Sequence, residues 1–284
     1  MARRRLKTWR AVIEVILATI AAAIVLKMFV VDAVRVQTSS MAETILPGDL
    51  ILVNKLSYGM AAKHLPFSQS GFSFPLLPRL KNVMRGDVIV FQLPGDRDST
   101  PSRESVPYVK RCVAVGGDVI IIRHGKLWVN GEEMTPCPEH GAPRFPENFV
   151  DGRLFPQGER FNLDNYGPIR VPKRGDIVTV SRENYHVWEK LICREGHTVA
   201  LDAGNQTLLD GRPTSSYTVE NNYLFALGDN FYNSYDSRFW GFLPEENVIG
   251  EASLVYWSLI PSGDEGRASG GALVRWNRVG KFIR

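Results

Sequence analysis

The chain has 284 residues, enough for one large globular domain or two modest ones, and its 44% hydrophobic and 23% charged residues favour a packed core over disorder. Five of its 34 basic residues stand within positions 1–10. The other basic residues are nearly balanced by the 30 acidic residues, so the rest of the chain is close to neutral. A nucleic-acid-binding body needs a basic face to neutralise phosphates. The charge balance argues against such a face, so we expect no nucleic acid among the partners.

The three cysteines are too few for a disulfide framework, and their odd number leaves at least one thiol unpaired. A bridge between Cys137 and Cys193 fits an oxidising compartment, but three free thiols, Cys112 included, fit the sequence equally well. No cysteine or histidine spacing is typical of a metal site. We therefore expect no metal.

An apolar run of 21 residues, 11–31, directly follows the basic segment 1–10. A helix that rises about 1.5 Å per residue can cross a hydrocarbon core of roughly 30 Å with such a run. The two charges of the run, Glu14 and Lys27, lie near its ends, where long side chains reach the membrane surface. By the positive-inside rule, residues 1–10 stay in the cytoplasm and everything beyond about residue 31 lies outside.

Two other interpretations of this run are weaker than an uncleaved, single-pass signal anchor. A cleaved secretory signal would use the alanines at 21–23 as its cleavage site, but the apolar run continues past them. A helix buried in the globular domain would leave the basic flank at 1–10 without an explanation.

Beyond residue 32 the pattern changes to short segments rich in Val, Ile, Tyr and Phe that are separated by Gly-Asp and Asn-Gly pairs. Such segments predict strands joined by tight turns, and no long helical period follows the anchor. The predicted fold is mainly β, with a main domain of coiled antiparallel sheets or a barrel. The expected strands cover 33–37, 50–55, 87–92, 108–114, 119–123, 126–129, 177–181, 186–193, 198–201, 207–209, 223–228 and 251–257.

Two stretches interrupt this pattern. Residues 134–173 are rich in Pro, Gly and Asn and predict a long excursion that leads into a smaller inserted β subdomain at about 174–222. Residues 56–84 are irregular but unusually apolar. They either dip into the membrane interface, with lipid as a partner, or cover the core of the barrel.

Four short stretches carry polar residues typical of chemistry: 38–59 (TSSMAETILPGDLILVNKLSYG), 85–91 (RGDVIVF), 108–118 (YVKRCVAVGGD) and 228–250 (GDNFYNSYDSRFWGFLPEENVIG). Lys110 lies inside an apolar strand, where a lysine usually points to solvent at a sheet edge. If it points inward, burial disfavours its charged form and lowers its pKa. A neutral amine near a serine hydroxyl then accepts that hydroxyl's proton.

These four stretches, in this order after an N-terminal anchor, closely resemble bacterial signal peptidase I from about residue 34 to 258. The matches VKRCVAVGGD and SYDSRFWGFLP keep the family's spacing and are highly specific. The resemblance implies a membrane serine endopeptidase with a Ser-Lys dyad. Carried over residue by residue, it assigns Ser40 as nucleophile and Lys110 as general base. It assigns oxyanion-hole and supporting roles to Thr38, Ser234, Asp236 and Arg238.

The implied reaction is acyl transfer: Ser40 attacks the scissile carbonyl, neutral Lys110 takes its proton, and water later hydrolyses the acyl-enzyme without a cofactor. The implied substrate is a signal peptide of an exported preprotein, cut after small residues in an Ala-x-Ala pattern. It would add as an extended strand between two segments of the enzyme. The residues expected to bind it are Arg35, Val36, Gln37, Pro107, Tyr108 and Val109.

The nucleophile loop departs from the family pattern PSxSMxPT, because both prolines are absent from Gln37–Thr44 and Glu43 brings a charge. Phe231 replaces the arginine of GDNR, and Gly116 replaces the proline that follows the lysine strand. No catalytic group is lost. Ser39 offers an alternative nucleophile, but Met41 fixes the register in favour of Ser40.

Two rival functions remain. One is a specialised Ser-Lys processing peptidase, and the other is a non-catalytic, membrane-tethered β domain that binds peptides. The expected location is the bacterial cytoplasmic membrane, with the N-terminus cytoplasmic and the catalytic domain outside. The expected domains are a basic tail (1–10), a transmembrane anchor (11–31), a catalytic β domain (32–133 and 223–260), an inserted loop and β subdomain (134–222) and a basic, aromatic tail (261–284).

Overall fold

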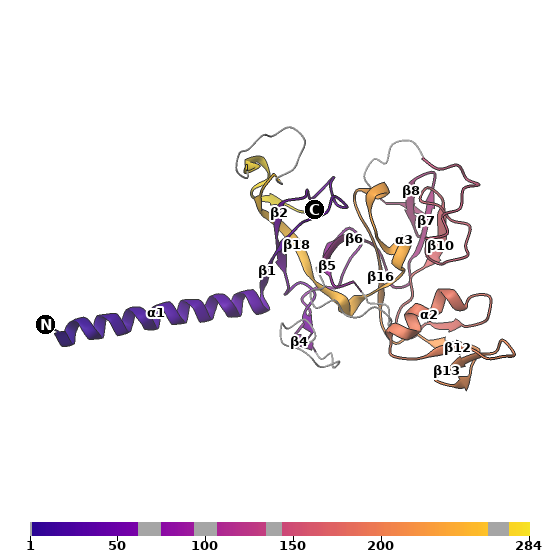
Figure 1. Ribbon diagram of the computed structural model, residues 1–284, viewed down its shortest axis with the longest axis horizontal. Coiled ribbons are helices and arrows are strands. Elements are labelled where there is room, and N and C mark those ends of the chain that lie inside the picture. The colour runs from indigo at the N-terminus through magenta and orange to yellow at the C-terminus, as the bar shows by residue number, and fades with distance from the viewer. Residues whose placement is uncertain (1, 62–74, 94–106, 135–143, 261–272) are drawn as a thin grey trace.

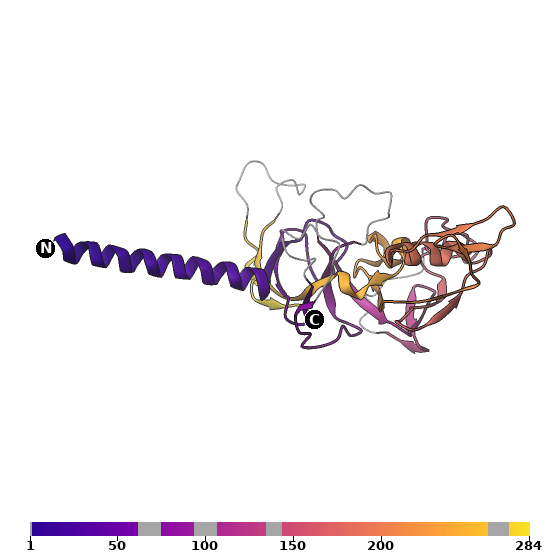
Figure 2. The same cartoon turned by 90° about the horizontal axis from the view of Figure 1, so that it is seen from below.

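A computed structural model describes residues 2–61, 75–93, 107–134, 144–260 and 273–284. A single long helix, α1 (Ala2–Phe29), extends away from a β-rich body, and the sheets that contain β7, β8, β10, β12 and β13 lie at the end of the body farthest from it (Figures 1 and 2). Among the described residues, α1 holds the one segment long and apolar enough to cross a membrane, Val12–Phe29. The mainly β prediction is confirmed.

The body is organised around one antiparallel, curled sheet in the order β1-β2-β18-β5-β6-β16-β17, with β19 paired to β18. Alternating burial along β2 places Ile51 and Val53 in the core, as expected for a strand with one covered face. All four residues of β5 are buried, because both of its faces are covered. The strands are β1 (Val31–Arg35), β2 (Asp49–Asn54), β5 (Val88–Phe91), β6 (Tyr108–Val115), β16 (Tyr223–Leu227), β17 (Leu243–Pro244), β18 (Val248–Ser258) and β19 (Lys281–Phe282).

Smaller sheets follow the central one. A four-stranded sheet has the order β10-β7-β8-β9, a three-stranded sheet has the order β12-β13-β14, and β11-β15 and β3-β4 are pairs. Their bounds are β3 (Met60–Ala61), β4 (Pro75–Leu77), β7 (Val119–Arg123), β8 (Lys126–Val129), β9 (Glu132–Glu133), β10 (Tyr166–Arg170), β11 (Ile177–Thr179), β12 (Val199–Leu201), β13 (Thr207–Leu209), β14 (Arg212–Pro213) and β15 (Ser216–Thr218).

Short helices complete the fold. The strand expected over 186–193 is wrong, because this segment is the helix α2. Positions 187, 188, 191 and 192 recur at helical spacing and pack on the core. Burial of this helical face outweighs the preference of β-branched and aromatic residues for strands. The helices are α2 (Tyr185–Arg194) and α3 (Ser237–Trp240), with 3-10 turns η2 (Phe231–Asn233), η3 (Glu245–Asn247) and η4 (Trp276–Arg278).

The segment 134–173, expected to be an irregular excursion, contributes a strand and core residues over its described part. β10 pairs with β7, and Leu154, Phe155 and Tyr166 are buried in the same cluster as Phe225 of the central sheet. Gly167 and Pro168 inside β10 conceal this strand from the sequence pattern. Cys137 and most of the apolar part of 56–84 lie outside the described residues, and the division into a catalytic and an inserted domain stays a prediction.

Candidate active site

The structure brings Ser40 and Lys110 together although they stand 70 residues apart in the chain. Lys110 lies on β6, a central strand between β5 and β16, and is 3% exposed, so its side chain points inward rather than to solvent. Ser40 lies in the turn after β1, where buried Met41 and Ile45 anchor the loop to the core below. The Lys110 Nζ atom is 2.5 Å from Ser40 Oγ.

The environment of Lys110 shifts its proton equilibrium. Burial of the ammonium group lowers the pKa of Lys110 to about 8, although the carboxylates of Asp236 and Asp229 oppose this shift. A substantial fraction of the amine is therefore neutral near pH 8. A neutral amine in contact with a hydroxyl has the geometry and the proton affinity of a general base.

Thr38 and Ser234 flank the pair in different ways. The exposed Thr38 has its Oγ1 atom 3.3 Å from Ser40 Oγ. Ser234 is buried beside the nucleophile loop, but within the described residues its Oγ makes no hydrogen bond, so the expected contact with the Lys110 amine is not made in this structure. Ser234 and the Ser40 backbone both approach Gly228. A Cβ atom added at Gly228 would lie 2.2 Å from Ser234 Oγ and 2.4 Å from the Ser40 carbonyl oxygen. Only glycine permits this close approach.

Asp236 and Arg238 form a fully buried ion pair that shapes the turn carrying Ser234. Arg238 Nε and Nη2 donate to the Asp236 carboxylate at 2.9 and 2.8 Å, and the backbone N–H groups of Gly228 and Arg238 donate to the same carboxylate. The Arg238 guanidinium also lies 4.1 Å from the centre of the Phe231 ring. The unusual phenylalanine therefore stacks on this pair.

A second buried ion pair was not assigned a role from the sequence. Arg111, the neighbour of Lys110, donates from Nε and Nη2 to the Asp229 carboxylate at 2.8 and 2.6 Å. Thr44 of the nucleophile loop donates to the same carboxylate at 2.5 Å. Arg111 thus connects β6, the 228–240 segment and the nucleophile loop. The sequence did contain one indication of this role: Arg111 directly follows the candidate base Lys110 and therefore lies on the opposite face of the same strand.

Asparagine side chains hold the nucleophile loop from one side. Asn230 donates from its backbone N–H to the Ser40 carbonyl at 3.0 Å and from Nδ2 to the Ser39 carbonyl at 3.0 Å. Asn233 Nδ2 donates to Ser39 Oγ at 3.0 Å. These bonds fix the loop in place of the absent prolines, and they leave Ser39, unlike Ser40, without contact to the lysine amine.

A pocket of about 400 Å³ opens over the Ser40–Lys110 pair. One wall is the end of β1 and the residues after it, another is the start of β6, and Asn233 and Tyr235 close a third side. All six residues expected to bind substrate line this pocket: Arg35, Val36, Gln37, Pro107, Tyr108 and Val109. An extended peptide in this pocket would lie between the segments 35–37 and 107–109. The backbone N–H and C=O groups of these two segments could then form hydrogen bonds with the two edges of the peptide.

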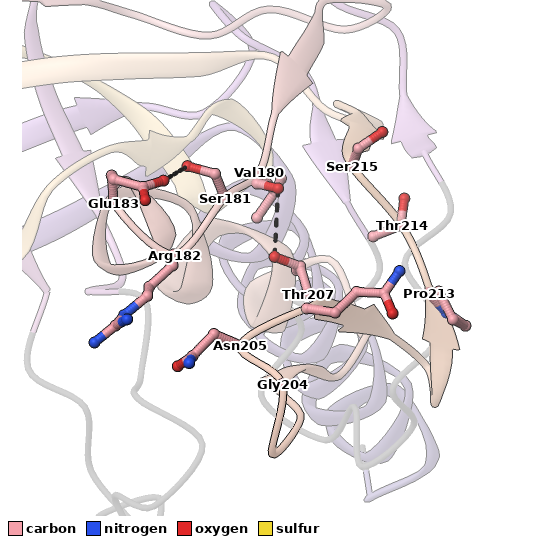
Figure 3. A pocket seen from close by; sticks show the side chains of 11 residues that line it. Val180, Ser181, Arg182, Glu183, Gly204, Asn205, Thr207, Pro213, Thr214 and Ser215 are labelled. Atoms are coloured by element: carbon pink, nitrogen blue, oxygen red, sulfur yellow. Dashed lines mark hydrogen bonds between the residues drawn. The ribbon is translucent and has the colours of Figure 1, made fainter.

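A larger, more open and polar hollow of about 840 Å³ lies elsewhere, around the loops before α2 and between β12 and β15 (Figure 3). It is lined by 180–183, 204–207 and 213–215. None of the predicted site residues lies there. Among the described residues, no group of three or more His, Cys, Asp or Glu side chains is placed to hold a metal ion.

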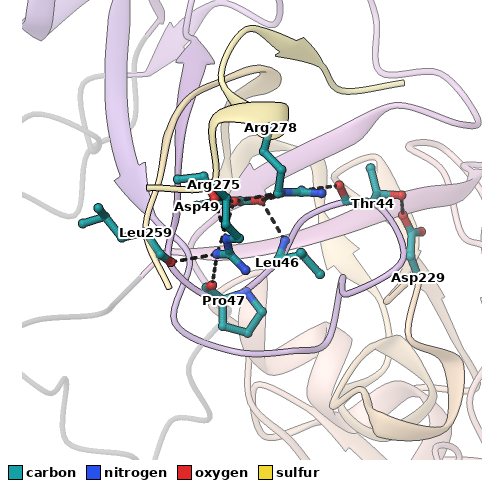
Figure 4. Close-up of polar contacts among 9 residues, drawn as sticks. Thr44, Leu46, Pro47, Asp49, Asp229, Leu259, Arg275 and Arg278 are labelled. Atoms are coloured by element: carbon teal, nitrogen blue, oxygen red, sulfur yellow. Dashed lines mark hydrogen bonds and ion pairs between the residues drawn. The ribbon is translucent and has the colours of Figure 1, made fainter. Parts of the chain in front are cut away.

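The C-terminal segment contacts residues 44–49, which follow Ser40 (Figure 4). Arg278 Nη2 donates to the Asp49 carboxylate at 2.5 Å and to the Thr44 carbonyl at 3.0 Å. Arg275 Nη2 donates to the Pro47 carbonyl at 2.5 Å. Burial opposes ionisation of Asp49, but the hydrogen bonds from Arg278, Ser258 and the Leu46 backbone, together with the charge of Arg278, outweigh it, so the pKa of Asp49 lies below its usual value.

Arg278→Met is expected to lower the free energy of unfolding by about 3–5 kcal/mol, because it strands a fully buried carboxylate without its main partner. Urea denaturation followed by tryptophan fluorescence measures this. Arg170→Met is the matched control, because Arg170 is half-exposed and pairs with Asp176 at the surface. It should change stability little. Equal losses in both variants would contradict a special role for Arg278.

The family model and the curated relatives agree on one family. The family model described as "Signal peptidase, peptidase S26" matches residues 9–257. A signal peptidase I of Helicobacter pylori is 26% identical over 279 residues, which cover 93% of this chain and 90% of the relative. A signal peptidase I of Aquifex aeolicus is 28% identical over 250 residues, which cover 86% and 82%. A solved signal peptidase I of Enterococcus faecalis V583 matches with a TM-score of 0.29 and 19% identity, and covers 61% of this chain and 98% of that one.

Proposed function

The chain belongs to the signal peptidase family, peptidase S26, and from this premise we propose that it removes signal peptides from exported preproteins with a Ser40–Lys110 dyad. The observation that carries the proposal is the 2.5 Å approach of a buried lysine amine to a serine hydroxyl at the base of a pocket. A domain that only bound peptides would have no need to bury a lysine there, since an unpaired buried ammonium group destabilises the fold.

The proposed mechanism begins with Ser40 Oγ attacking the carbonyl carbon of the scissile bond while its proton moves to the Lys110 amine. The tetrahedral oxyanion accepts hydrogen bonds from the Ser40 backbone N–H and the Thr38 hydroxyl. The intermediate collapses to an ester on Ser40, and the Lys110 ammonium gives its proton to the departing amine. Lys110 then takes a proton from water, which attacks the ester; the Lys110 ammonium returns the proton to Ser40 Oγ as the signal peptide leaves.

Supporting roles follow from the contacts around the dyad. The Asp236–Arg238 and Arg111–Asp229 pairs hold the 228–240 segment and β6 in place, and the carboxylates moderate the pKa of Lys110. Ser234 has a free hydroxyl beside the Ser40 loop. We assign it the positioning of the lysine amine in the substrate complex, when catalytic hydrogen bonds tighten.

The substrate preference is proposed from the size and placement of the pocket. The signal peptide would extend along Arg35–Gln37 on one side and Pro107–Val109 on the other. The pocket of about 400 Å³ is shared among several substrate positions, and we propose that the side chains next to the cut are small. Alanine at the first and third positions before the scissile bond satisfies this limit, in the Ala-x-Ala pattern of secretory signals.

The chain in lipid vesicles is expected to cut a preprotein whose signal ends in Ala-x-Ala and to release the mature protein. Replacing the alanine before the scissile bond with leucine should lower kcat/KM by about a hundredfold or more, because a side chain that does not fit displaces the carbonyl from Ser40. Mass spectrometry of the products locates the cut. The matched control is leucine at the middle position, which faces away from the pocket in an extended peptide. Equal cleavage of all three substrates would contradict the proposed specificity.

The proposed topology places Val12–Phe29 across the membrane with the basic N-terminus in the cytoplasm. The helix leads directly into β1, so the body lies next to the membrane surface (Figure 1). Preproteins held in the membrane by their apolar segments would then present their cleavage sites on the same side as the pocket.

A further inference from the structure

The junction between α1 and the central sheet is unusually short. α1 ends at Phe29 and β1 begins at Val31, so a single residue separates the helix from the strand. A single connecting residue still has two rotatable backbone bonds, φ and ψ, one on either side of its Cα atom. Without a further contact, the sheet could swing about this point relative to the helix.

Lys55 supplies that further contact. It follows β2 and is buried, and its Nζ atom donates to the Lys27 carbonyl at 3.2 Å and approaches the Met28 carbonyl at 3.5 Å. Carbonyl groups in the last turn of a helix have no partner within the helix, and the end of the helix carries a partial negative charge. The ammonium group of Lys55 therefore caps α1.

The same side chain also binds the strand side of the junction. Lys55 Nζ lies 2.8 Å from the Asp32 carboxylate of β1, and the Lys55 backbone N–H donates to the Val30 carbonyl at 2.9 Å. One residue thus contacts the last turn of the helix, the connecting residue and the first strand. We name this set of contacts the Lys55 clamp.

The Lys55 clamp closes a ring of contacts that includes the pocket. β1 pairs with β2 from Val31 opposite Asn54 to Arg35 opposite Leu50, and Lys55 directly follows β2. The end of β1 is itself a wall of the pocket. The ring consists of the end of α1, β1, β2 and the Lys55 clamp. Because each of these parts is held by hydrogen bonds, the pocket wall formed by β1 has a fixed direction relative to α1.

This ring sets a distance as well as a direction. The five residues of β1, at about 3.3 Å each, place the pocket roughly 16 Å from the end of the helix. If the helix spans the membrane, the pocket is then held at one height above the membrane surface. A substrate whose apolar segment is embedded in the same membrane would present only one stretch of its chain at that height.

We propose that Lys55, together with Asp32, is a positioning residue that fixes the height of the catalytic pocket above the membrane and so selects which peptide bond of a membrane-held preprotein is cut. This inference rests on the proposed function, because it needs a substrate anchored by its apolar segment. It concerns the choice among chemically equivalent cleavage sites and not the bond-breaking step.

The test uses the full chain in phospholipid vesicles and a preprotein with two Ala-x-Ala sites about five residues apart, which separates them by roughly 16 Å when extended. A soluble peptide with the same two sites but no apolar segment serves as the second substrate. Wild type is expected to prefer one site of the preprotein and to cut the peptide with little preference. In Lys55→Met, the ratio of the two cuts in the preprotein should move roughly tenfold toward the ratio in the peptide, as expected for loss of charge-assisted hydrogen bonds.

The control variants separate height from folding and charge. Lys55→Arg keeps a cationic donor and should keep most of the wild-type ratio, whereas Asp32→Asn should shift the ratio in the same direction as Lys55→Met. Lys126→Met removes an exposed lysine that pairs with Glu133 and should change nothing. Cleavage of the soluble peptide should stay within about twofold of wild type in every variant, because these residues lie outside the pocket.

Two outcomes overturn the inference. One is a wild-type ratio of the two preprotein cuts in both Lys55→Met and Asp32→Asn. The other is an equal loss of peptide and preprotein cleavage in both variants, because the clamp would then support the pocket itself and not its height. Failure of the proposed function gives a different result, in which wild type cuts neither substrate.

Discussion

Ser40→Ala is expected to lower kcat/KM for preprotein cleavage by about ten-thousandfold or more, the loss that follows when a nucleophile of a serine peptidase is removed. The Oγ atom of Ser40 is the hydroxyl oxygen in contact with the Lys110 amine, and its loop is fixed by buried neighbours and by two asparagines. The substitution removes one oxygen at the end of the pocket. The fold should therefore be unchanged, and circular dichroism and thermal denaturation check this.

Ser39→Ala is the matched control for Ser40→Ala, since the two serines are adjacent and lose the same atom. Ser39 Oγ accepts a hydrogen bond from Asn233 and has no contact with the lysine, so its loss should cost at most about tenfold in kcat/KM. A result in which Ser39→Ala is inactive and Ser40→Ala is active would reverse the assignment of the nucleophile. Full activity in Ser40→Ala would contradict the assignment of Ser40 as the nucleophile.

Lys110→Met is expected to reduce kcat/KM by a similar factor, because no other group within the described site is placed to take the Ser40 proton. Methionine matches the length of the apolar part of lysine and keeps the buried space filled. Lys110→Arg should be equally inactive, because a guanidinium group stays protonated at every pH at which the protein is folded. Lys126→Met, at an exposed position, should retain full activity.

The pH dependence of wild type gives the second measurement for Lys110. The neutral amine is the active form, so kcat/KM should fall about tenfold per pH unit below the pKa of Lys110 and level off above it. Because burial lowers that pKa to about 8, the change in slope should appear near pH 8 rather than near the ordinary lysine value of about 10.4. A kcat/KM profile that is flat between about pH 6 and about pH 9 would contradict a lysine base.

The candidate site was accessible to sequence analysis because its residues stand in short, local patterns. Ser40 and Lys110 each lie in a stretch whose neighbours fix its register, so one position implies the next. Their contact joins two such stretches, and only the order β5-β6-β16 of the folded sheet brings the lysine side chain inward. The sequence left open whether Lys110 pointed to solvent, since strand periodicity does not reveal whether a strand is central or at an edge.

Other features depend on contacts that no local pattern encodes. Helix α2 was expected to be a strand, because Tyr, Val, Trp and Ile favour strands and only burial against the core selects the helical face. The pairing of β10 with β7 was hidden by Gly167 and Pro168. Arg278 binds the Asp49 carboxylate across more than 200 residues of sequence, and a chain pattern gives no sign of such a partner.

The position of β18 in the central sheet has a consequence for the order in which this protein matures. β18 pairs with β2 on one side and β5 on the other, so it joins the half of the sheet that leads to Ser40 with the half that carries Lys110. Yet it spans Val248–Ser258, far downstream of both Ser40 and Lys110. Before this strand is in place, the segments that carry Ser40 and Lys110 are not joined through it, and closing such a long-range pairing is a late event in folding. We therefore expect the proposed Ser40–Lys110 pair to form, and cleavage to begin, only once β18 has paired with both halves of the sheet.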